Sequence, residues 1–219
     1  MEIRRKIKIE HLSKTFKENM VLKDISLEME SGKIYGIIGR NGSGKTVLFK
    51  CICGFVIPDN HSVYVDGELI GKQRQVLADA GIIIEEPAFL ANRSGYKNLE
   101  FLYCINHQKD KEHIYKIMKL VGLDPDCTKK VKHYSMGMRQ RLAIAQAIME
   151  DQSILILDEP MNGLDKEGVR DMRKLFLELK RQGKLILLAS HNRDDINILC
   201  DEIFEIDKGI VEKVDNMNG

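Results

Sequence analysis

The hydrophobic positions in the first part of the chain follow the two-residue period of β-strands. Polar and apolar residues alternate over 3–12 and again over 25–29, and a continuous apolar run follows at 34–38. Alternation is typical of a strand with one buried face, and a continuous run of a strand buried on both faces. Two short strands, 63–65 and 68–70, flank Asp66-Gly67, a dipeptide that favours a hairpin turn. We therefore expect an antiparallel β region beside a main sheet.

The period changes to that of helices in the middle of the chain. One helix is expected to begin near Lys45 and to end at Gly54, and a short strand follows at 80–84. After Pro87, apolar residues recur with helical spacing; the segments are 97–105, 112–121 and 137–149. Residues 86–150 are therefore expected to form an inserted helical subdomain.

Strand patterns return in the last part of the chain. Apolar runs at 154–157 and 185–188 flank a helix whose apolar stripe covers 169–179 and which should end at Gly183. Strand, helix and strand in this order predict a βαβ unit in a parallel sheet. A terminal hairpin is expected from the strands 203–206 and 210–214, before a polar tail that should fray. The pattern predicts an α/β fold with one domain over 1–219, whose core consists of 1–85 and 151–219.

Composition and charge exclude several classes of protein. The 219 residues include 34 Lys and Arg against 33 Asp and Glu. Such a balance disfavours a dedicated nucleic-acid binder, which carries an excess of basic residues. No apolar run approaches the roughly 20 residues that span a bilayer, and the N-terminus lacks the apolar stretch of a signal peptide. Five scattered cysteines suit a reducing compartment. We therefore expect a cytoplasmic protein that contacts no nucleic acid.

Residues 39–46 match the pattern of a phosphate-binding loop between a buried strand and a helix. Backbone N–H groups of such a glycine-rich turn bind phosphate oxygens, and the helix dipole adds to the attraction. In this pattern Lys45 reaches the terminal phosphates and Thr46 ligates Mg²⁺. A random chain of this length would match on the order of one per cent of the time. The predicted nucleotide site comprises Gly39, Arg40, Asn41, Gly42, Ser43, Gly44, Lys45, Thr46 and Val47.

An acidic pair follows the strand 154–157. Asp158 and Glu159 come at the carboxyl end of a predicted parallel strand, which is the sheet edge where α/β folds bind ligands. Asp158 can hold Mg²⁺ there, and Glu159 can polarise a water for attack on the γ-phosphate. Taken alone, an acidic pair at the end of a strand would be a solvated strand end about as often as a functional site. With the phosphate-binding loop upstream, the pair predicts a P-loop NTPase core of the RecA-like type that binds ATP and Mg²⁺.

The remaining motifs resemble those of the ATP-binding cassette (ABC) ATPases. Residues 134–141 read Tyr-Ser-Met-Gly-Met-Arg-Gln-Arg and are similar to the signature motif of that family. Residues 162–165 resemble its D-loop, and His191 matches its switch histidine. Phe16 falls where the family has an aromatic side chain that stacks on adenine. These motifs extend over nearly the whole chain, and their order is similar to that in an ABC nucleotide-binding domain.

The resemblance implies an ATPase with separate membrane-spanning partners. Glu159, His191 and Lys45 would be its catalytic residues. The signature would close over ATP held by a second subunit, in an ATP-dependent head-to-tail homodimer or a heterodimer with a paralogous ATPase. The chain would then lie on the inner face of the membrane, bound to its partners. The signature residues that would contact this ATP are Ser135, Met136, Gly137 and Met138. From the residues alone, Ser135 could equally be a helix N-cap and nothing more.

Three positions in two motifs depart from the common family pattern. Met136 and Met138 replace a glycine and a glutamine of the usual signature, and Glu85 stands where a loop glutamine normally contacts Mg²⁺. We expect Glu85 to ligate Mg²⁺ when nucleotide is bound. Both departures resemble the branch that serves bacitracin- and lantibiotic-type export and immunity. A soluble ABC ATPase acting on nucleic acid or ribosomes is the alternative, but such relatives carry insertions or a second cassette that 219 residues do not accommodate.

The segment between the two predicted parts of the chain is the candidate partner surface. Loops that join rigid parts often carry recognition, and this one covers 85–96. Phe89 and Leu90 are its candidate apolar anchors. Ordinary packing within the helical subdomain is the competing interpretation for both side chains.

Overall fold

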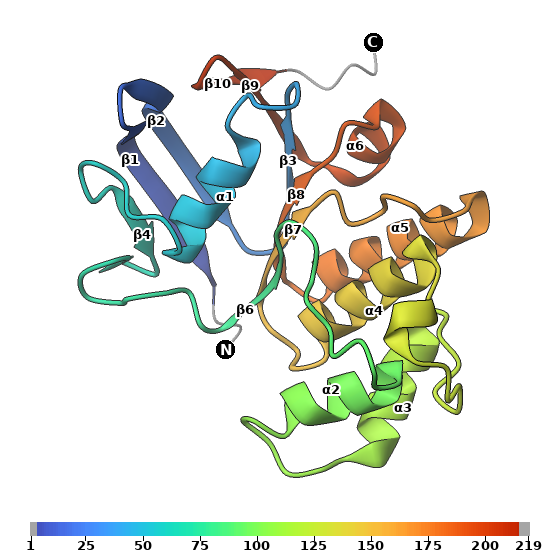
Figure 1. Cartoon of the computed structure of the whole chain (residues 1–219). Helices are drawn as coiled ribbons and strands as arrows, with labels where there is room; N and C mark the ends of the chain where they lie inside the picture. Colours follow the sequence, from blue (N-terminus) through green and yellow to red (C-terminus); the bar gives the residue numbers. More distant parts are fainter. Residues whose placement is uncertain (1–3, 215–219) are drawn as a thin grey trace.

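The computed structural model describes residues 4–214 (Figure 1). Its strands are β1 (Lys6–Phe16), β2 (Asn19–Glu30), β3 (Ile34–Ile38), β4 (Val63–Val65), β5 (Glu68–Leu69), β6 (Ala80–Ile83), β7 (Ile154–Asp158), β8 (Leu185–Ala189), β9 (Glu202–Asp207) and β10 (Ile210–Val214). Its helices are α1 (Lys45–Cys53), α2 (Gly95–Tyr103), α3 (Lys111–Leu120), a 3₁₀ turn (Val131–His133), α4 (Met136–Ile148), α5 (Lys166–Arg181) and α6 (Arg193–Leu199).

The strands form two sheets. The larger has the order β10-β9-β3-β8-β7-β6, in which only the edge pair β10 and β9 is antiparallel. The smaller, β2-β1-β4-β5, is antiparallel throughout. In the larger sheet, β8 separates β3 from β7. The loops after β3, β8, β7 and β6 therefore leave from one edge as neighbours, which places the predicted site motifs side by side.

Alternate residues of the larger sheet enter two different hydrophobic clusters. Tyr35, Ile156 and Leu187 face α1 and the antiparallel sheet, and α1 lies between the two sheets (Figure 1). Ile34, Leu155 and Leu188 face the other way, toward a cluster built with α2 to α6. This period-two division follows from the pleat, because successive side chains point to opposite faces. The α/β fold with a parallel sheet and an antiparallel β region is thus confirmed.

The β1–β2 hairpin is longer than the alternation predicts. Its register shifts between Ile9 and Leu12 and again on either side of Lys14. His11 and Asp24 have positive φ values of 54° and 49°, and their side chains share a hydrogen bond of 2.7 Å. Such bulges insert residues that break the two-residue period. The strand residues beyond 12 and before 25 therefore escaped prediction.

Other differences concern element ends. Helix α2 begins two residues earlier than its apolar spacing predicts, because Ser94 caps it by accepting a hydrogen bond from the Lys97 N–H. Helix α6 was not predicted, since its seven residues are too short to show a period. The start of the first expected strand, Ile3, and the tail expected to fray, 215–219, lie outside the described residues. The division into a core and a subdomain over 86–150 stays a prediction. Over the described part of the chain, no helix has the length and apolar character needed to cross a membrane.

Candidate functional site

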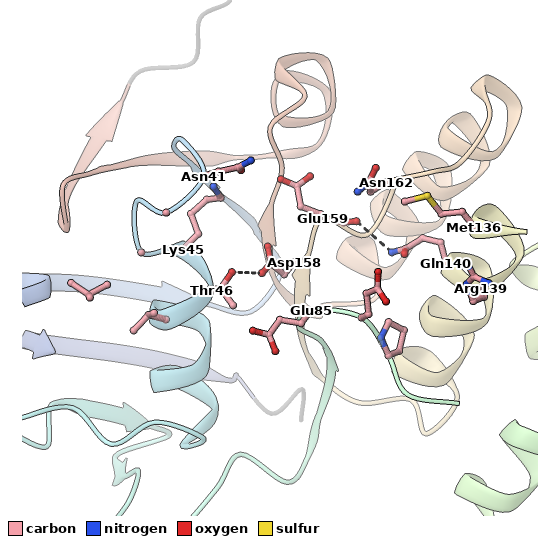
Figure 2. Close-up of a pocket in the computed structure, with 16 residues that line it drawn as sticks. Asn41, Lys45, Thr46, Glu85, Met136, Arg139, Gln140, Asp158, Glu159 and Asn162 are labelled. Atoms are coloured by element: carbon pink, nitrogen blue, oxygen red, sulfur yellow. Dashed lines mark hydrogen bonds between the residues drawn. The ribbon is translucent and has the colours of Figure 1, made fainter. Parts of the chain in front are cut away.

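A cleft of about 650 Å³ opens at the edge of the sheet where β3, β7 and β6 end (Figure 2). Three loops contribute to it, from after β3, after β7 and after β6, together with the amino end of α4. Its lining residues are Val21, Asn41, Gly42, Gly44, Lys45, Thr46, Val47, Glu85, Glu86, Pro87, Met136, Arg139, Gln140, Asp158, Glu159 and Asn162. The cleft lies where ligands bind in open parallel sheets.

The loop after β3 is crowded in a way that requires glycine. Gly39 has a φ of 152°, and a Cβ on it would meet the Ile206 carbonyl oxygen at 2.4 Å. Gly44 has a φ of 115°, and a Cβ there would meet Leu22 at 2.9 Å. Both conformations are strained for residues with a side chain. The glycines thus let the loop turn tightly before α1, with backbone N–H groups available to an anion.

Lys45 is a buried cation at the start of α1. It is only 7% exposed, and its Nζ donates to the carbonyls of Gly39 at 2.7 Å and Arg40 at 3.2 Å. Among the described residues it forms no ion pair. Nearby, the buried Ser43 Oγ has no hydrogen-bond partner within the described chain. A buried positive charge and an unpaired hydroxyl both favour binding of a polyanion, so the loop fits a nucleotide phosphate.

Thr46 and Asp158 form an oxygen pair at the floor of the cleft. Thr46 Oγ1 donates to Asp158 Oδ2 at 2.7 Å (Figure 2). Mg²⁺ prefers oxygen ligands and is usually held by one or two protein oxygens together with substrate phosphates and waters. The described residues contain no group of three or more His, Cys, Asp or Glu side chains that could hold a metal without such help. The donor set therefore fits Mg²⁺ only as a companion of bound phosphate.

Glu159 and His191 are in contact just after the ends of β7 and β8. The Glu159 N–H donates to the Ala189 carbonyl at 2.9 Å, which ties the end of β7 to the end of β8. His191 Nδ1 lies 2.8 Å from Glu159 Oε2. Because an ionised carboxylate only accepts, the hydrogen belongs to Nδ1. The neighbouring strands thus bring together two candidate catalytic side chains that are 32 positions apart in sequence.

The predicted signature begins α4. Ser135 is its N-cap, and the Ser135 Oγ accepts a hydrogen bond from the Met138 N–H at 3.2 Å. Met136 is 52% exposed and covers Gly163, where an added Cβ would lie 2.6 Å from its Cγ. The Gly163 carbonyl oxygen in turn lies 3.0 Å from where a Cβ on Gly137 would be. The amino end of α4 therefore packs on the turn that follows Glu159.

Glu85 lines the cleft and has a partner on α1. Lys50 Nζ donates to Glu85 Oε1 at 2.6 Å. Glu85 also has a φ of 60°, a left-handed conformation that a non-glycine residue rarely adopts. Lys50 comes four residues after Thr46 and so shares its side of the helix. Lys50 could not be predicted from the sequence, because only the fold shows that α1 faces the loop after β6.

Some predicted residues lie away from the cleft wall. Phe16 is 44% exposed near the β1–β2 turn, where Lys14 Nζ lies 5.3 Å from the centre of its ring. His191 reaches the cleft only through Glu159. The predicted residues that do not line the cleft are Phe16, Gly39, Arg40, Ser43, Ser135, Gly137, Met138 and His191. Conversely, six residues line it that were not among the predicted site residues: Val21, Glu86, Pro87, Arg139, Gln140 and Asn162. Gln140 follows Met136 by one helical turn, a spacing that could have indicated it.

The sheet order, the glycine-rich loop and the acidic pair define a P-loop nucleoside triphosphatase. A family profile described as "ABC transporter" matches residues 22–162, more than half of the chain. The chain belongs to the ABC transporter family, as one of its ATP-binding, ATP-hydrolysing subunits. The predicted resemblance to the ABC ATPases is confirmed.

Two named relatives come from the branch that the sequence resembles. The bacitracin transport ATP-binding protein BcrA of Enterococcus faecalis is 37% identical over 211 residues, which cover 95% of this chain and 68% of that protein. The lantibiotic transport ATP-binding protein SrtF of Streptococcus pyogenes is 34% identical over 209 residues, or 94% of this chain and 90% of that protein. An uncharacterized ABC transporter ATP-binding protein of Bacillus subtilis, YybJ, is 38% identical over 206 residues, or 94% of both chains.

Solved structures share the fold. A dimeric ATP-binding cassette described in a post-hydrolysis state with ADP and phosphate superposes with a TM-score of 0.86, at 20% identity, over 97% of this chain and 99% of that one. A cassette of Clostridium perfringens that is part of an ABC transporter complex superposes with a TM-score of 0.80, at 28% identity, over 94% of this chain and 86% of that one. The two-sheet architecture is therefore that of an ABC cassette.

Proposed function

We propose that this ATPase powers export of a peptide or antibiotic-like compound through separate membrane-spanning subunits. The observation that carries the mechanism is the convergence of Lys45, Thr46, Asp158 and Glu159 on one cleft. Export of such a compound is supported by the relatives named for bacitracin and lantibiotic transport. Because the described helices are not suited to span a membrane, the transport path would belong to the partners. The chain would then work at the cytoplasmic face of the membrane.

In this proposal the loop residues bind ATP and Glu159 acts on water. The N–H groups of the 39–46 loop and the Lys45 ammonium bind the β- and γ-phosphates. Thr46 and Asp158 would hold Mg²⁺, which supplies charge neutralisation on the phosphates. Glu159 accepts a proton from the water that attacks the γ-phosphorus, and the bond to the bridging oxygen breaks. His191 orients the Glu159 carboxylate through its 2.8 Å hydrogen bond.

The amino end of α4 would bind ATP held by a second subunit. Ser135, Gly137 and Met138 do not line the cleft around Lys45, although they begin a helix, whose N–H groups attract anions. A head-to-tail dimer, either of two copies or with a paralogous ATPase, would bring a phosphate of the second subunit's ATP to this helix end. The cassette of similar fold that was solved as a dimer supports this arrangement.

Turnover and nucleotide affinity, measured in parallel, test the proposed chemistry. Glu159→Gln keeps the shape of the side chain but removes the base, so turnover should fall at least about 100-fold while ATP affinity stays within about twofold. Lys45→Ala should instead weaken ATP binding, because it removes the buried cation. A Glu159→Gln variant with wild-type turnover would exclude Glu159 as the base.

A further inference from the structure

The side-chain amide of Gln140 holds the backbone of the candidate base. Gln140 lies in the second turn of α4 and its Nε2 donates to the Pro160 carbonyl at 2.8 Å. The same nitrogen lies 3.4 Å from the Glu159 carbonyl oxygen (Figure 2). The two acceptors are the carbonyl oxygens of the two peptide bonds that follow Glu159. An amide is suited to this role because its two N–H groups point in different directions.

The Glu159 backbone needs such support. Its φ of 50° is left-handed, a conformation that costs free energy for a residue with a side chain. The Ala189 carbonyl fixes its N–H on one side, and the Asn162 N–H donates to its carbonyl at 3.1 Å on the other. Proline at 160 offers no N–H, so at that residue only the carbonyl can form a backbone hydrogen bond. Gln140 supplies the donor for that carbonyl.

We infer that Gln140 is a positioning residue for ATP hydrolysis, which sets the direction of the Glu159 carboxylate through the Glu159 and Pro160 carbonyls. This inference rests on the proposed role of Glu159. The backbone conformation of a residue fixes the direction of its Cα–Cβ bond, and a small misplacement of a catalytic group is costly in rate. In this role Gln140 acts through the Glu159 backbone and not on the reacting atoms.

The position of Gln140 also links two functions of α4. Its first turn carries Ser135 and Met136, and Met136 packs on Gly163 of the same turn that Gln140 anchors. An α-helix is rigid over a few residues, so a movement of its amino end moves Gln140 as well. Capture of the second subunit's ATP by α4 would thereby adjust Glu159 in its own chain.

The test compares Gln140→Met with Glu159→Gln and the double variant in steady-state hydrolysis and in ATP affinity. Methionine keeps the length and flexibility of the side chain but cannot donate. Gln140→Met should lower kcat about 10- to 100-fold while ATP affinity stays within about twofold. In the Glu159→Gln background the same change should have no further effect, because residues that act through one another are non-additive. The matched control is Gln182→Met at the end of α5, where the amide bonds only Glu178 within residues 4–214, and it should hydrolyse ATP like the wild type.

Three results would overturn the inference. Gln140→Met could retain wild-type kcat, which would show that the two hydrogen bonds do not position Glu159. It could lower turnover by the same factor in both backgrounds, which would show a role independent of Glu159. It could lower ATP affinity and melting temperature together with kcat, which would show a merely structural contact. Failure of the proposed function looks different, because Glu159→Gln alone would then hydrolyse ATP normally.

Discussion

At the scale of single residues, Glu85 is paired with a lysine and is also a candidate metal ligand. It lines the cleft that contains Asp158, and it accepts a hydrogen bond from Lys50. Its side chain is 64% exposed, so the ion pair with Lys50 contributes about 0–1 kcal/mol and is readily exchanged. A divalent cation beside it would compete with the lysine for the same oxygen. We therefore propose Glu85 as a ligand of Mg²⁺ in the nucleotide complex.

Substitutions at Glu85 test this through the Mg²⁺ dependence of hydrolysis. Glu85→Gln keeps an oxygen but loses the charge, so turnover should survive and the Mg²⁺ concentration for half-maximal activity should rise about two- to tenfold. Glu85→Ala should lose turnover as well. Lys50→Met should lower the Mg²⁺ requirement, because it removes the competing cation.

Glu86→Ala is the control for that series and should leave the Mg²⁺ dependence unchanged. If Glu86→Ala shifts the Mg²⁺ dependence and Glu85→Ala does not, the ligand is the second residue of the pair. If neither shifts it, the loop after β6 does not contact the metal.

Residue patterns could indicate candidate site residues where a side chain's expected role depends on its neighbours in sequence. Lys45, Thr46, Asp158 and Glu159 were proposed because strand, loop and helix are consecutive, and all four line the cleft. Gln140 and Lys50 were missed because their partners lie 20 and 35 positions away, and only the strand order brings them close. The same holds for the hydrogen bond between His191 and Glu159, which the sequence could suggest only through a resemblance.

At the scale of elements, a charge cluster stabilises the start of the helical region. Lys97, Lys109 and the Tyr96 hydroxyl all donate to the Glu100 carboxylate, at 2.6, 2.9 and 2.8 Å. Burial alone would raise the pKa of Glu100, but the hydrogen bonds from these donors outweigh it and lower that pKa to about 2. Tyr96 also packs edge-on against Tyr115 of α3. The cluster therefore connects α2, the loop after it and α3.

Because of this cluster, we expect part of the free energy of unfolding to depend on pH in the acid range. Because the folded pKa of Glu100 lies below its unfolded value of about 4.5, the charge stabilises the fold above pH 4.5. The contribution is lost as pH falls toward about 2. Glu100→Gln should therefore lower the free energy of unfolding at pH 7 by on the order of 1 kcal/mol, since water screens the half-exposed lysines. Urea melts at pH 7 and near pH 2 measure this, and an equal difference at both would contradict the assignment.

Element prediction succeeded where the hydrophobic period was unbroken. The strand expected at 34–38 coincides with β3, because a buried run marks its ends. The helix expected from near Lys45 to Gly54 matches α1, which ends at Cys53 with Gly54 as its C-cap. The bulges at His11 and Asp24 and the short helix α6 were missed. In those segments side-chain hydrogen bonds and tertiary packing decide the conformation, and neither leaves a period in the sequence.

At the scale of the whole molecule, the loop after β6 carries the two apolar side chains that we propose as anchors for a partner, and they differ in exposure. Phe89 packs against the hydrophobic cluster of the helical side, whereas Leu90 is 49% exposed. The buried Asn98 holds Leu90 by accepting from its N–H at 2.7 Å and donating to its carbonyl at 3.2 Å. Leu90 is therefore the better candidate for an anchor to a membrane subunit, and Phe89 serves packing.

Co-expression with a candidate membrane-spanning subunit, followed by co-purification, tests the anchor. Leu90→Asp should reduce the amount of bound partner at least about tenfold, since it places a charge in an apolar contact, and should leave ATP affinity unchanged. Leu120→Asp on α3 is the matched control, because Leu120 is equally exposed at 49%. Equal loss in both variants would indicate a general effect on the fold, and no loss in Leu90→Asp would remove Leu90 from the interface.

Dimer formation should depend on both ATP and Ser135. The amino end of α4 carries N–H groups and a positive helix dipole, but the cleft around Lys45 does not include Ser135. ATP should therefore convert the Glu159→Gln variant, which cannot consume it, from monomer to dimer in sedimentation. Ser135→Asp keeps a good N-cap, yet it places a negative charge opposite the γ-phosphate. In the Glu159→Gln background this change should keep the protein monomeric with ATP.

The same substitution at the N-cap of another helix distinguishes a loss of phosphate binding from a loss of helix stability. Ser94 caps α2 as Ser135 caps α4, so Ser94→Asp makes the same chemical change at a helix that is not proposed to bind ATP. It should dimerise normally, and Ser135→Thr, which keeps both the cap and the hydroxyl, should do so as well. If Ser135→Asp also dimerises with ATP, the charge does not face a phosphate and the composite site is wrong. If the Glu159→Gln protein stays monomeric at saturating ATP, the dimer does not form from this chain alone.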